Sequence, residues 1–313
     1  MSTRALIYGT IALDTLITPA GQVSKVLGGS GPYAALAAGL LTNRAELFGV
    51  VGDDFPQSYR MALETRGVSM RHVACVPGQK TFAWTGRYEQ DMNLRTTLST
   101  EEGVQEHWRP LPPPALRECG LVVAANVTPP LQYTLLGHCR SDAFVMADFM
   151  KSWIIRERDY TDKLLARANM ALMNDEEACE YARTASPIEA GYALLDAGPA
   201  YAVVKHGSAG STLFHRTPAG DVRLFRCPAW PLPAPQDPTG AGDSYMGALA
   251  GYLTGELRDG SAPDWECVTR GIAIATVVAG AVCEHFGTVS LFSLSRRELA
   301  DRLASFHAMT AWN

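Results

Sequence analysis

The stretch that decides the fold is "PQDPTGAGDSYMGALAGYL", residues 235–253. Two glycines lie two positions apart between Thr239 and Asp243, and an apolar run of helical period follows at once. Glycines at alternate positions let successive backbone N–H groups converge on one point, and the following helix adds the positive end of its dipole. This stretch therefore predicts a loop that binds an anion at the start of a helix.

The carboxyl group of Asp243 has two interpretations at this position. A transferring phosphoryl group is negatively charged and is stabilised by such N–H donors, and a neighbouring carboxylate can accept the proton of an attacking hydroxyl. Asp243 would then be a general base. Aspartate is also among the preferred N-cap residues, so it could simply cap the helix while the glycines form a tight turn. Both interpretations stay open on this stretch alone.

The rest of the chain limits the classes of partner. The net charge is -5 over 313 residues, and Lys and Arg form no run longer than a pair. This argues against a nucleic-acid or membrane surface and favours a small-molecule partner. Seven scattered cysteines without CxxC spacing indicate reduced, mostly buried thiols. No signal-peptide core and no run of about 18 apolar residues is present, so we expect a cytoplasmic protein.

Short apolar runs alternate with helical patterns along the chain. Runs such as "AELFGVVG", "GLVVAAN", "AFVMADF" and "AYAVVKHG" are typical of strands covered on both faces, and residues 4–13 also look β-rich. Residues 33–41, "QSYRMALETRG" and "PIEAGYALLDAG" are typical of helices. The alternation predicts a three-layer α/β/α sandwich around a mostly parallel, doubly wound sheet. We expect one domain over residues 1–313.

Residues 80–98 break this rhythm. Phe82, Trp84 and Tyr88 share one side of an alternating pattern, and Thr81 and Thr85 share the other. We interpret this as a small β-sheet lid formed by about residues 14–27 and 78–100. Its aromatic and polar side chains could close on an acceptor, or the aromatic face could pair with a second subunit.

"GGSGPYAAL" at Gly28 has a rival interpretation. It satisfies the GxGxxA pattern of dinucleotide-binding proteins, with Asp53 or Asp54 at about the expected distance. In that fold, however, the motif follows the first strand directly, whereas the opening run here continues to Asp14. A nicotinamide enzyme is therefore disfavoured. The pattern GxxxxGK[ST] is absent, which also disfavours a P-loop kinase.

The motifs together resemble the ribokinase-like, or PfkB, family of carbohydrate and nucleoside kinases. "DPTGAGD" looks like its C-terminal signature, and "GTIALD", "GGSGPYAALAAGLL", "NDEE", "VKHGSAG" and "EHFGT" fall in the family's order. The resemblance extends over residues 4–305. It implies the ribokinase-like fold and an ATP-dependent, magnesium-requiring kinase.

The resemblance also implies roles for individual positions. Asp243 would be the catalytic base, with the anion hole formed by Gly240, Ala241 and Gly242. The acceptor would be held by Asp14, Gly28, Gly29, Tyr33 and the lid residue Arg95. ATP would lie against Lys205, Gly207, Gly210, Thr239 and Gly287. Asn174 and Glu177 would organise Mg²⁺ through water, and Asp237 would complete a candidate K⁺ site near Gly287. Asn174 could alternatively be only a helix cap, and residues 207–210 only a hairpin turn.

The sequence departs from the family pattern in the acceptor motifs. Tyr33 stands where many members have Asn, and residues 148–152 replace the common DxNxR, with Lys151 a candidate substitute for one polar contact. These departures leave the acceptor open. We favour a sugar or sugar-like molecule, with a nucleoside as the alternative and a non-catalytic ligand sensor of the same fold as the second. The resemblance also admits a homodimer formed through the lid.

Overall fold

The computed structural model describes residues 3–257 and 262–311. A nine-stranded sheet forms its centre, with the strand order β13-β12-β11-β10-β9-β8-β1-β4-β5. From β5 to β11 in this order, each strand is parallel to the next. Strand β12 is antiparallel to β11, and β13 is antiparallel to β12. The strands are β1 (Ala5–Tyr8), β4 (Ala45–Gly52), β5 (Ser69–Val76), β8 (Leu121–Ala124), β9 (Phe144–Asp148), β10 (Met170–Asn174), β11 (Tyr201–Lys205), β12 (Ser211–Arg216) and β13 (Val222–Cys227).

Side chains alternate between two hydrophobic cores, one on each face of this sheet. In β1, Ile7 belongs to one core and Leu6 and Tyr8 to the other; in β10, Leu172 and Met173 divide in the same way. Helices cover both faces because each face is apolar. The doubly wound α/β/α prediction is confirmed.

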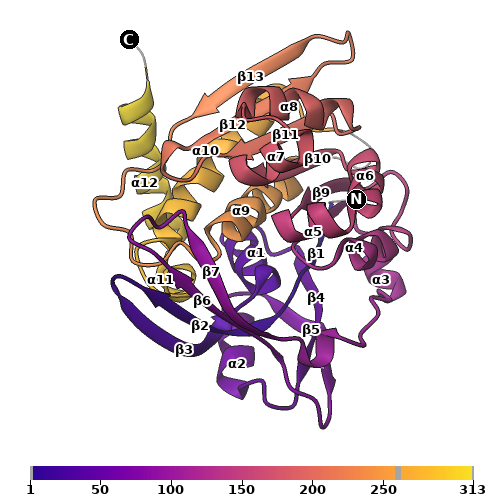
Figure 1. The fold of residues 1–313 in the computed structure, drawn as a ribbon, viewed down its shortest axis with the longest axis vertical. Helices are drawn as coiled ribbons and strands as arrows, with labels where there is room; N and C mark the ends of the chain where they lie inside the picture. The colour runs from indigo at the N-terminus through magenta and orange to yellow at the C-terminus, as the bar shows by residue number, and fades with distance from the viewer. Residues whose placement is uncertain (1–2, 258–261, 312–313) are drawn as a thin grey trace.

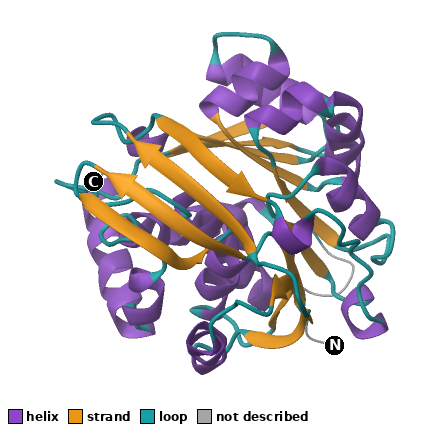
Figure 2. Cartoon of the chain, turned by 60° about the horizontal axis from the view of Figure 1, so that its bottom comes forward, coloured by secondary structure: helices purple, strands orange, loops and turns teal. Residues whose placement is uncertain are grey.

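The helices form the two outer layers of the sandwich (Figure 1; Figure 2). One core includes residues of α1 (Ser30–Gly39), α2 (Gln57–Thr65), α9 (Ala241–Glu256), α10 (Trp265–Val282), α11 (Val289–Ser293) and α12 (Arg296–Thr310). The other includes residues of α3 (Pro114–Arg117), α4 (Pro129–Leu136), α5 (Lys151–Arg156), α6 (Arg158–Arg167), α7 (Asp175–Ala182) and α8 (Pro187–Asp196). Two short 3-10 turns, η1 (Gly103–Gln105) and η2 (Gly207–Ala209), complete the elements.

Helices α1 and α9 lie backbone to backbone near the middle of the molecule, although they come from opposite ends of the chain (Figure 1). A Cβ on Gly247 would overlap the backbone of Ala34, and a Cβ on Gly251 would lie 2.7 Å from the carbonyl oxygen of Ala38. The close approach fixes the start of α9, and hence the predicted anion-binding loop, relative to the start of α1.

A second, four-stranded sheet lies beside the first, at the lower left of Figure 1. It has the order β3-β2-β6-β7 and consists of β2 (Ala12–Thr18), β3 (Gly21–Gly28), β6 (Phe82–Tyr88) and β7 (Arg95–Glu101). Its central pair, β2 and β6, is parallel, and the outer pairs are antiparallel. This is the small lid sheet expected from the sequence.

The apolar run at residues 4–13 is divided between the two sheets. It forms β1 of the large sheet and the start of β2 of the lid, with a break at residues 9–11. A Cβ on Gly9 would lie 2.6 Å from the backbone nitrogen of Gly31, so the chain passes close to the start of α1 where it leaves the large sheet. The apolar run continues through the break, so its pattern does not predict where the first strand ends.

Helix α10 is long and apolar enough to span a membrane by length and composition, with 56% of its 18 residues buried inside the protein. It packs against α9 and α12, as a core helix does. All seven cysteines are free. Only Cys119 and Cys227 are fully buried and Cys75 is exposed, so the expectation of mostly buried thiols is wrong.

Candidate active site

Polar side chains follow the carboxyl ends of four adjacent parallel strands. Asn126 lies just beyond β8, Asp148 ends β9, Asn174 ends β10 and Lys205 ends β11. In open α/β sheets, ligands bind at this edge because the loops that leave the strands are free to diverge there. The start of α9 faces the same edge, since its first residues contact Lys205 and Tyr33.

The loop before α9 has the geometry of an anion-binding site. Gly240 is the N-cap residue of α9 in the left-handed conformation (φ 75°), and the helix begins without a side-chain cap. Asp243 lies in the first turn and is not the N-cap. The capping interpretation of Asp243 is therefore wrong, and the first N–H groups of the helix have no side-chain acceptor from the cap position.

Asp243 lies in a cluster of charged groups with Asp148, Glu177 and Lys205. Lys205 Nζ is 3.0 Å from Asp148 Oδ1 and 3.2 Å from the position that a Cβ on Gly242 would take. Burial raises the pKa of Asp243 to about 7, and Asp148 adds to the rise while Lys205 opposes it. The sequence drew attention to Lys205 but gave Asp148 no role of its own.

A cavity of about 530 Å³ opens beside Asp243 and beneath the lid. It is lined by seven of the residues that the sequence nominated: Asp14, Gly29, Tyr33, Arg95, Thr239, Gly240 and Asp243. Two lid aromatics, Phe82 and Trp84, form part of its wall. The fold therefore brings the predicted acceptor residues and the predicted base together around one space.

The Asp14 carboxylate lies directly against Gly28 and Gly29. Asp14 Oδ2 accepts a hydrogen bond of 3.3 Å from the backbone N–H of Gly29, and it fills the space that a side chain on Gly28 would need. Burial raises the pKa of Asp14 to about 7, with Gly29 opposing the rise. The second carboxylate oxygen, Oδ1, is buried without a hydrogen-bond partner among the described residues.

Three other buried polar atoms that lack a partner within the described ranges belong to residues lining this cavity. They are the hydroxyl oxygen of Tyr33, Nε2 of Gln105 and Oδ1 of Asn126. Buried polar groups are nearly always hydrogen-bonded, so such atoms on a cavity wall are available to bond a ligand. The sequence missed Gln105 and Asn126. The polar residue that ends "GLVVAAN" was a usable signal for Asn126, whereas nothing distinguished Gln105.

Asn174 and Glu177 form a capping box at the start of α7. Asn174 Oδ1 accepts from the backbone N–H of Glu177, and Glu177 Oε2 accepts from the backbone N–H of Asn174, both at 2.8 Å. Asn174 is therefore a helix cap, and its proposed role with Mg²⁺ stays a prediction. Burial raises the pKa of Glu177 to about 7, with Lys205 lowering and Asp148 raising it.

The residues expected to bind nucleotide lie on two turns. Gly207 and Gly210 form the turn of the antiparallel pair β11 and β12, so the hairpin interpretation is also correct. Gly287 donates its N–H to Asp237 Oδ2 at 2.8 Å, and Asp237 Oδ1 accepts from the N–H of Thr239 at 2.9 Å. Asp237 is fully buried and joins the two loops.

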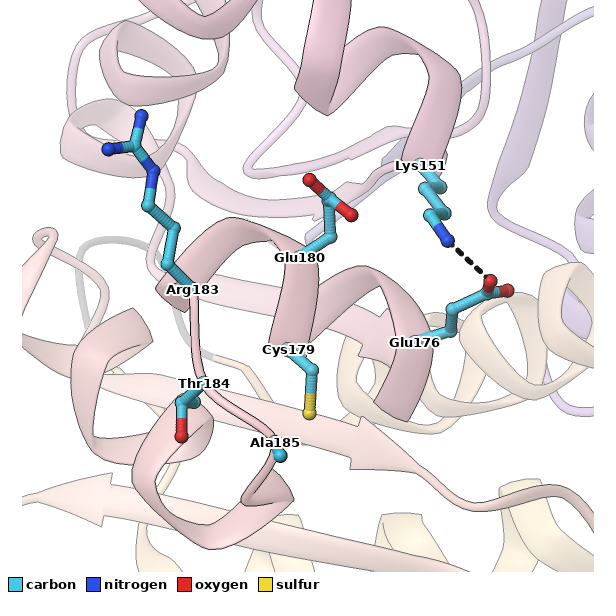
Figure 3. Close-up of a pocket in the computed structure, with 7 residues that line it drawn as sticks. All are labelled: Lys151, Glu176, Cys179, Glu180, Arg183, Thr184 and Ala185. Atoms are coloured by element: carbon cyan, nitrogen blue, oxygen red, sulfur yellow. Dashed lines mark hydrogen bonds and ion pairs between the residues drawn. The ribbon is translucent and has the colours of Figure 1, made fainter.

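Lys151 does not line the cavity beside Asp243. Its ammonium pairs with Glu176 at 2.6 Å, from α5 to α7, beside a separate surface hollow (Figure 3). Met150, Ser152, Trp153 and Arg156 of the same segment line the cavity beside Asp243 instead. The suggestion that Lys151 replaces a family contact to the acceptor is therefore not supported by its position.

Comparison with known proteins identifies the class. Residues 7–290 match the model of the pfkB family of carbohydrate kinases, and the chain belongs to this family. The relatives support a phosphotransferase, in agreement with the resemblance drawn from the motifs.

Individual relatives differ in the acceptor that their names give. A cytidine kinase of Thermococcus kodakarensis is 28% identical over 280 residues, covering 87% of this chain and 95% of its own. A ribokinase of Giardia lamblia superimposes with a TM-score of 0.76 at 19% identity, covering 98% of this chain and 100% of its own. A nucleoside kinase of Burkholderia thailandensis in complex with inosine gives 0.71 at 19% identity, covering 99% of each chain. The solved structures confirm the ribokinase fold.

Proposed function

We propose that this protein transfers the γ-phosphoryl group of ATP to a sugar hydroxyl of a nucleoside. The observation that carries the proposal is the acceptor cavity: it ends at Asp243 and has four buried polar atoms without partners among the described residues. Asp14 and Asn126 offer acceptors suited to sugar hydroxyls, whereas Gln105 Nε2 is a donor suited to a carbonyl or ring nitrogen.

A nucleoside is favoured over a free sugar by the cavity wall. Phe82 and Trp84 present aromatic surface on which a flat base can stack, and Gln105 adds a polar contact in the same space. The cytidine kinase relative supports the same choice. A free pentose or hexose is the second candidate, because ribokinases and a fructokinase share the fold.

The chemistry follows from residues at the sheet edge. The ionised Asp243 accepts the proton of the acceptor hydroxyl as its oxygen forms a bond to the γ-phosphorus, and the bond from that phosphorus to the bridging oxygen breaks to release ADP. Backbone N–H groups at the start of α9 stabilise the charge on the moving phosphoryl group. Lys205, 3.2 Å from where a Cβ on Gly242 would lie, adds a positive charge beside this loop.

The carboxylates fit a hydrated divalent cation. Within the described ranges no three His, Cys, Asp or Glu side chains converge to hold a metal directly. Mg²⁺ usually keeps several waters and is bound by one or two carboxylates together with phosphates, which suits Glu177 and Asp148 beside the nucleotide. Bound there, it would neutralise charge on the phosphates. Potassium near Asp237 and Gly287, a lid-mediated dimer and a single catalytic unit over residues 1–313 remain predictions.

The test is coupled ADP release with ATP and Mg²⁺ across nucleosides, pentoses, hexoses and polyols, with the product identified by mass spectrometry. We expect turnover with a nucleoside to exceed turnover with its base-free sugar. Asp243→Asn should lower kcat by at least about 10²-fold. Asp196→Asn, which alters an exposed ion pair with Arg216, is the matched control and should retain activity.

Two outcomes would contradict this proposal. Preferred turnover of a free sugar would replace the nucleoside with the second candidate. Binding of ATP without turnover of any acceptor would support the non-catalytic sensor.

A further inference from the structure

The lid contacts the segment before α9 at two points. Thr18 of β2 donates to the carbonyl oxygen of Gln236 at 2.9 Å, and Tyr88 is bonded to Thr239, directly before the predicted anion-binding loop. Tyr88 is the last residue of β6, and its hydroxyl accepts a hydrogen bond of 3.1 Å from Thr239 Oγ1. Both residues are buried, with 7% and 8% of their surfaces exposed. Since the partners lie 151 positions apart, the bond joins two elements that only the folded lid brings together.

Thr239 is held from two sides. Its hydroxyl donates to Tyr88, and its backbone N–H donates to the buried Asp237. The next residue is Gly240, where the chain takes the left-handed conformation that begins the anion-binding loop. The orientation of the Thr239 side chain is therefore fixed directly before the backbone groups that would receive the phosphoryl group.

The lid reaches a second loop of the site through its turn. The side chain of Asn93, in the turn between β6 and β7, contacts Gly207 in the turn that is expected to bind nucleotide. Within the lid, the guanidinium of Arg95 lies 5.4 Å from the ring centroid of Trp84. The end of β6 and the turn after it thus contact both proposed ATP-binding loops.

We propose that Tyr88 is a positioning residue for phosphoryl transfer. In the closed lid its hydroxyl orders Thr239 and, through it, the anion-binding loop, so that the loop reaches its reactive geometry only when the lid covers the acceptor. This inference rests on the proposed kinase function. It adds a link from acceptor binding to the phosphoryl site that neither Asp243 nor the acceptor contacts supply.

Tyr88→Phe removes only the hydroxyl and tests the link. The hydrogen bond is buried, so its loss should lower kcat by about tenfold while KM for the acceptor changes by less than about twofold. Thr239→Val removes only the bond to Tyr88, whereas Tyr88→Phe also removes an interaction with Arg95. Thr239→Val should therefore also lower kcat, and the double variant should lose no more than Tyr88→Phe alone, because the bond is shared.

The matched control is Tyr59→Phe. The Tyr59 hydroxyl also joins the body to the lid, donating to the carbonyl oxygen of Lys25 at 3.2 Å, but it does not touch the anion-binding loop. Tyr59→Phe should leave kcat unchanged. A rise in KM with unchanged kcat in Tyr88→Phe, or additive effects in the double variant, would overturn the proposal.

Hydrogen exchange provides a readout that needs no acceptor. In Tyr88→Phe the backbone amides of residues 237–243 should exchange faster than in the wild type, and in Tyr59→Phe they should not. Unchanged exchange in Tyr88→Phe overturns the inference even if no acceptor turns over. Faster exchange in a protein without kinase activity would support the link between lid and loop and contradict the proposed function alone.

Discussion

The ammonium of Lys205 lies 3.0 Å from the carboxylate of Asp148 at the carboxyl edge of the sheet, where β11 and β9 lie on either side of β10. Burial alone would lower the pKa of Lys205, but Asp148 and Glu177 outweigh it and hold the pKa above its ordinary value. The positive charge of Lys205 therefore interacts favourably with the carboxylates of both Asp148 and Glu177. The pKa values of Glu177 and Asp243, both raised to about 7, allow this cluster to take up a proton near neutral pH.

The pH dependence of kcat/KM should reflect this raised pKa. A general base must be ionised, so activity should fall about tenfold per pH unit below the pKa of Asp243, which is about 7. A profile of kcat/KM for the acceptor between pH 5 and 9 measures it. Activity that stays constant down to pH 5 would contradict either the raised pKa or the role of Asp243.

Replacement of Lys205 by Met should destabilise the protein by about 3–5 kcal/mol, because it leaves the buried Asp148 charge uncompensated. Urea unfolding measures the loss, and Lys205→Met combined with Asp148→Asn should recover most of it. The matched control is Lys151→Met at the exposed pair with Glu176, where we expect less than about 1 kcal/mol. Equal losses at the two sites would count against a buried ion pair.

Gly240→Ala should lower kcat by at least about tenfold. The backbone of Gly240 has φ 75°, which costs a residue with a Cβ roughly 1–2 kcal/mol, and the Cβ would overlap the ring of Tyr33. Gly255→Ala in the same helix, where nothing lies within 4 Å, is the control and should be neutral or slightly stabilising. Retained kcat in Gly240→Ala would show that the loop tolerates another shape.

Asp14→Asn should make the protein relatively more stable at high pH. The folded pKa of Asp14 is about 7 and the unfolded value about 4, so only the unfolded state releases this proton between these values. The stability contributed by the protonated carboxyl is therefore lost as the pH rises from about 4 to 7. Compared with wild type, the Tm of Asp14→Asn should improve between pH 5 and pH 8. A difference in Tm that does not depend on pH would contradict the raised pKa.

Local patterns were sufficient to predict where many residues of the candidate site lie. The glycine spacing and the helical run placed the anion-binding loop directly before α9, and the strand-ending positions of Asn174 and Lys205 placed them at one edge of the sheet. These predictions depend on neighbours in the sequence and on the rule that parallel strands present their carboxyl ends together.

Features that depend on distant packing were not predictable from the sequence. The break between β1 and β2 follows from a close approach of Gly9 to Gly31, and the direction of Lys151 follows from Glu176 on another helix. Gln105 lies in the short turn η1, which follows strand β7 of the lid. It lines the cavity because β7 brings the chain to the cavity wall. No local spacing encodes such contacts.

The backbone contact between α1 and α9 has a consequence for biosynthesis. Nearly every side of α1 is apolar and buried, yet its partner α9 is made roughly 200 residues later, which at ribosomal rates of 5–20 residues per second is about 10–40 s. During that interval the hydrophobic side of α1 that packs on α9 has no partner, although β1, β3 and β4 are already made. We expect this segment to be where chaperones engage the growing polypeptide.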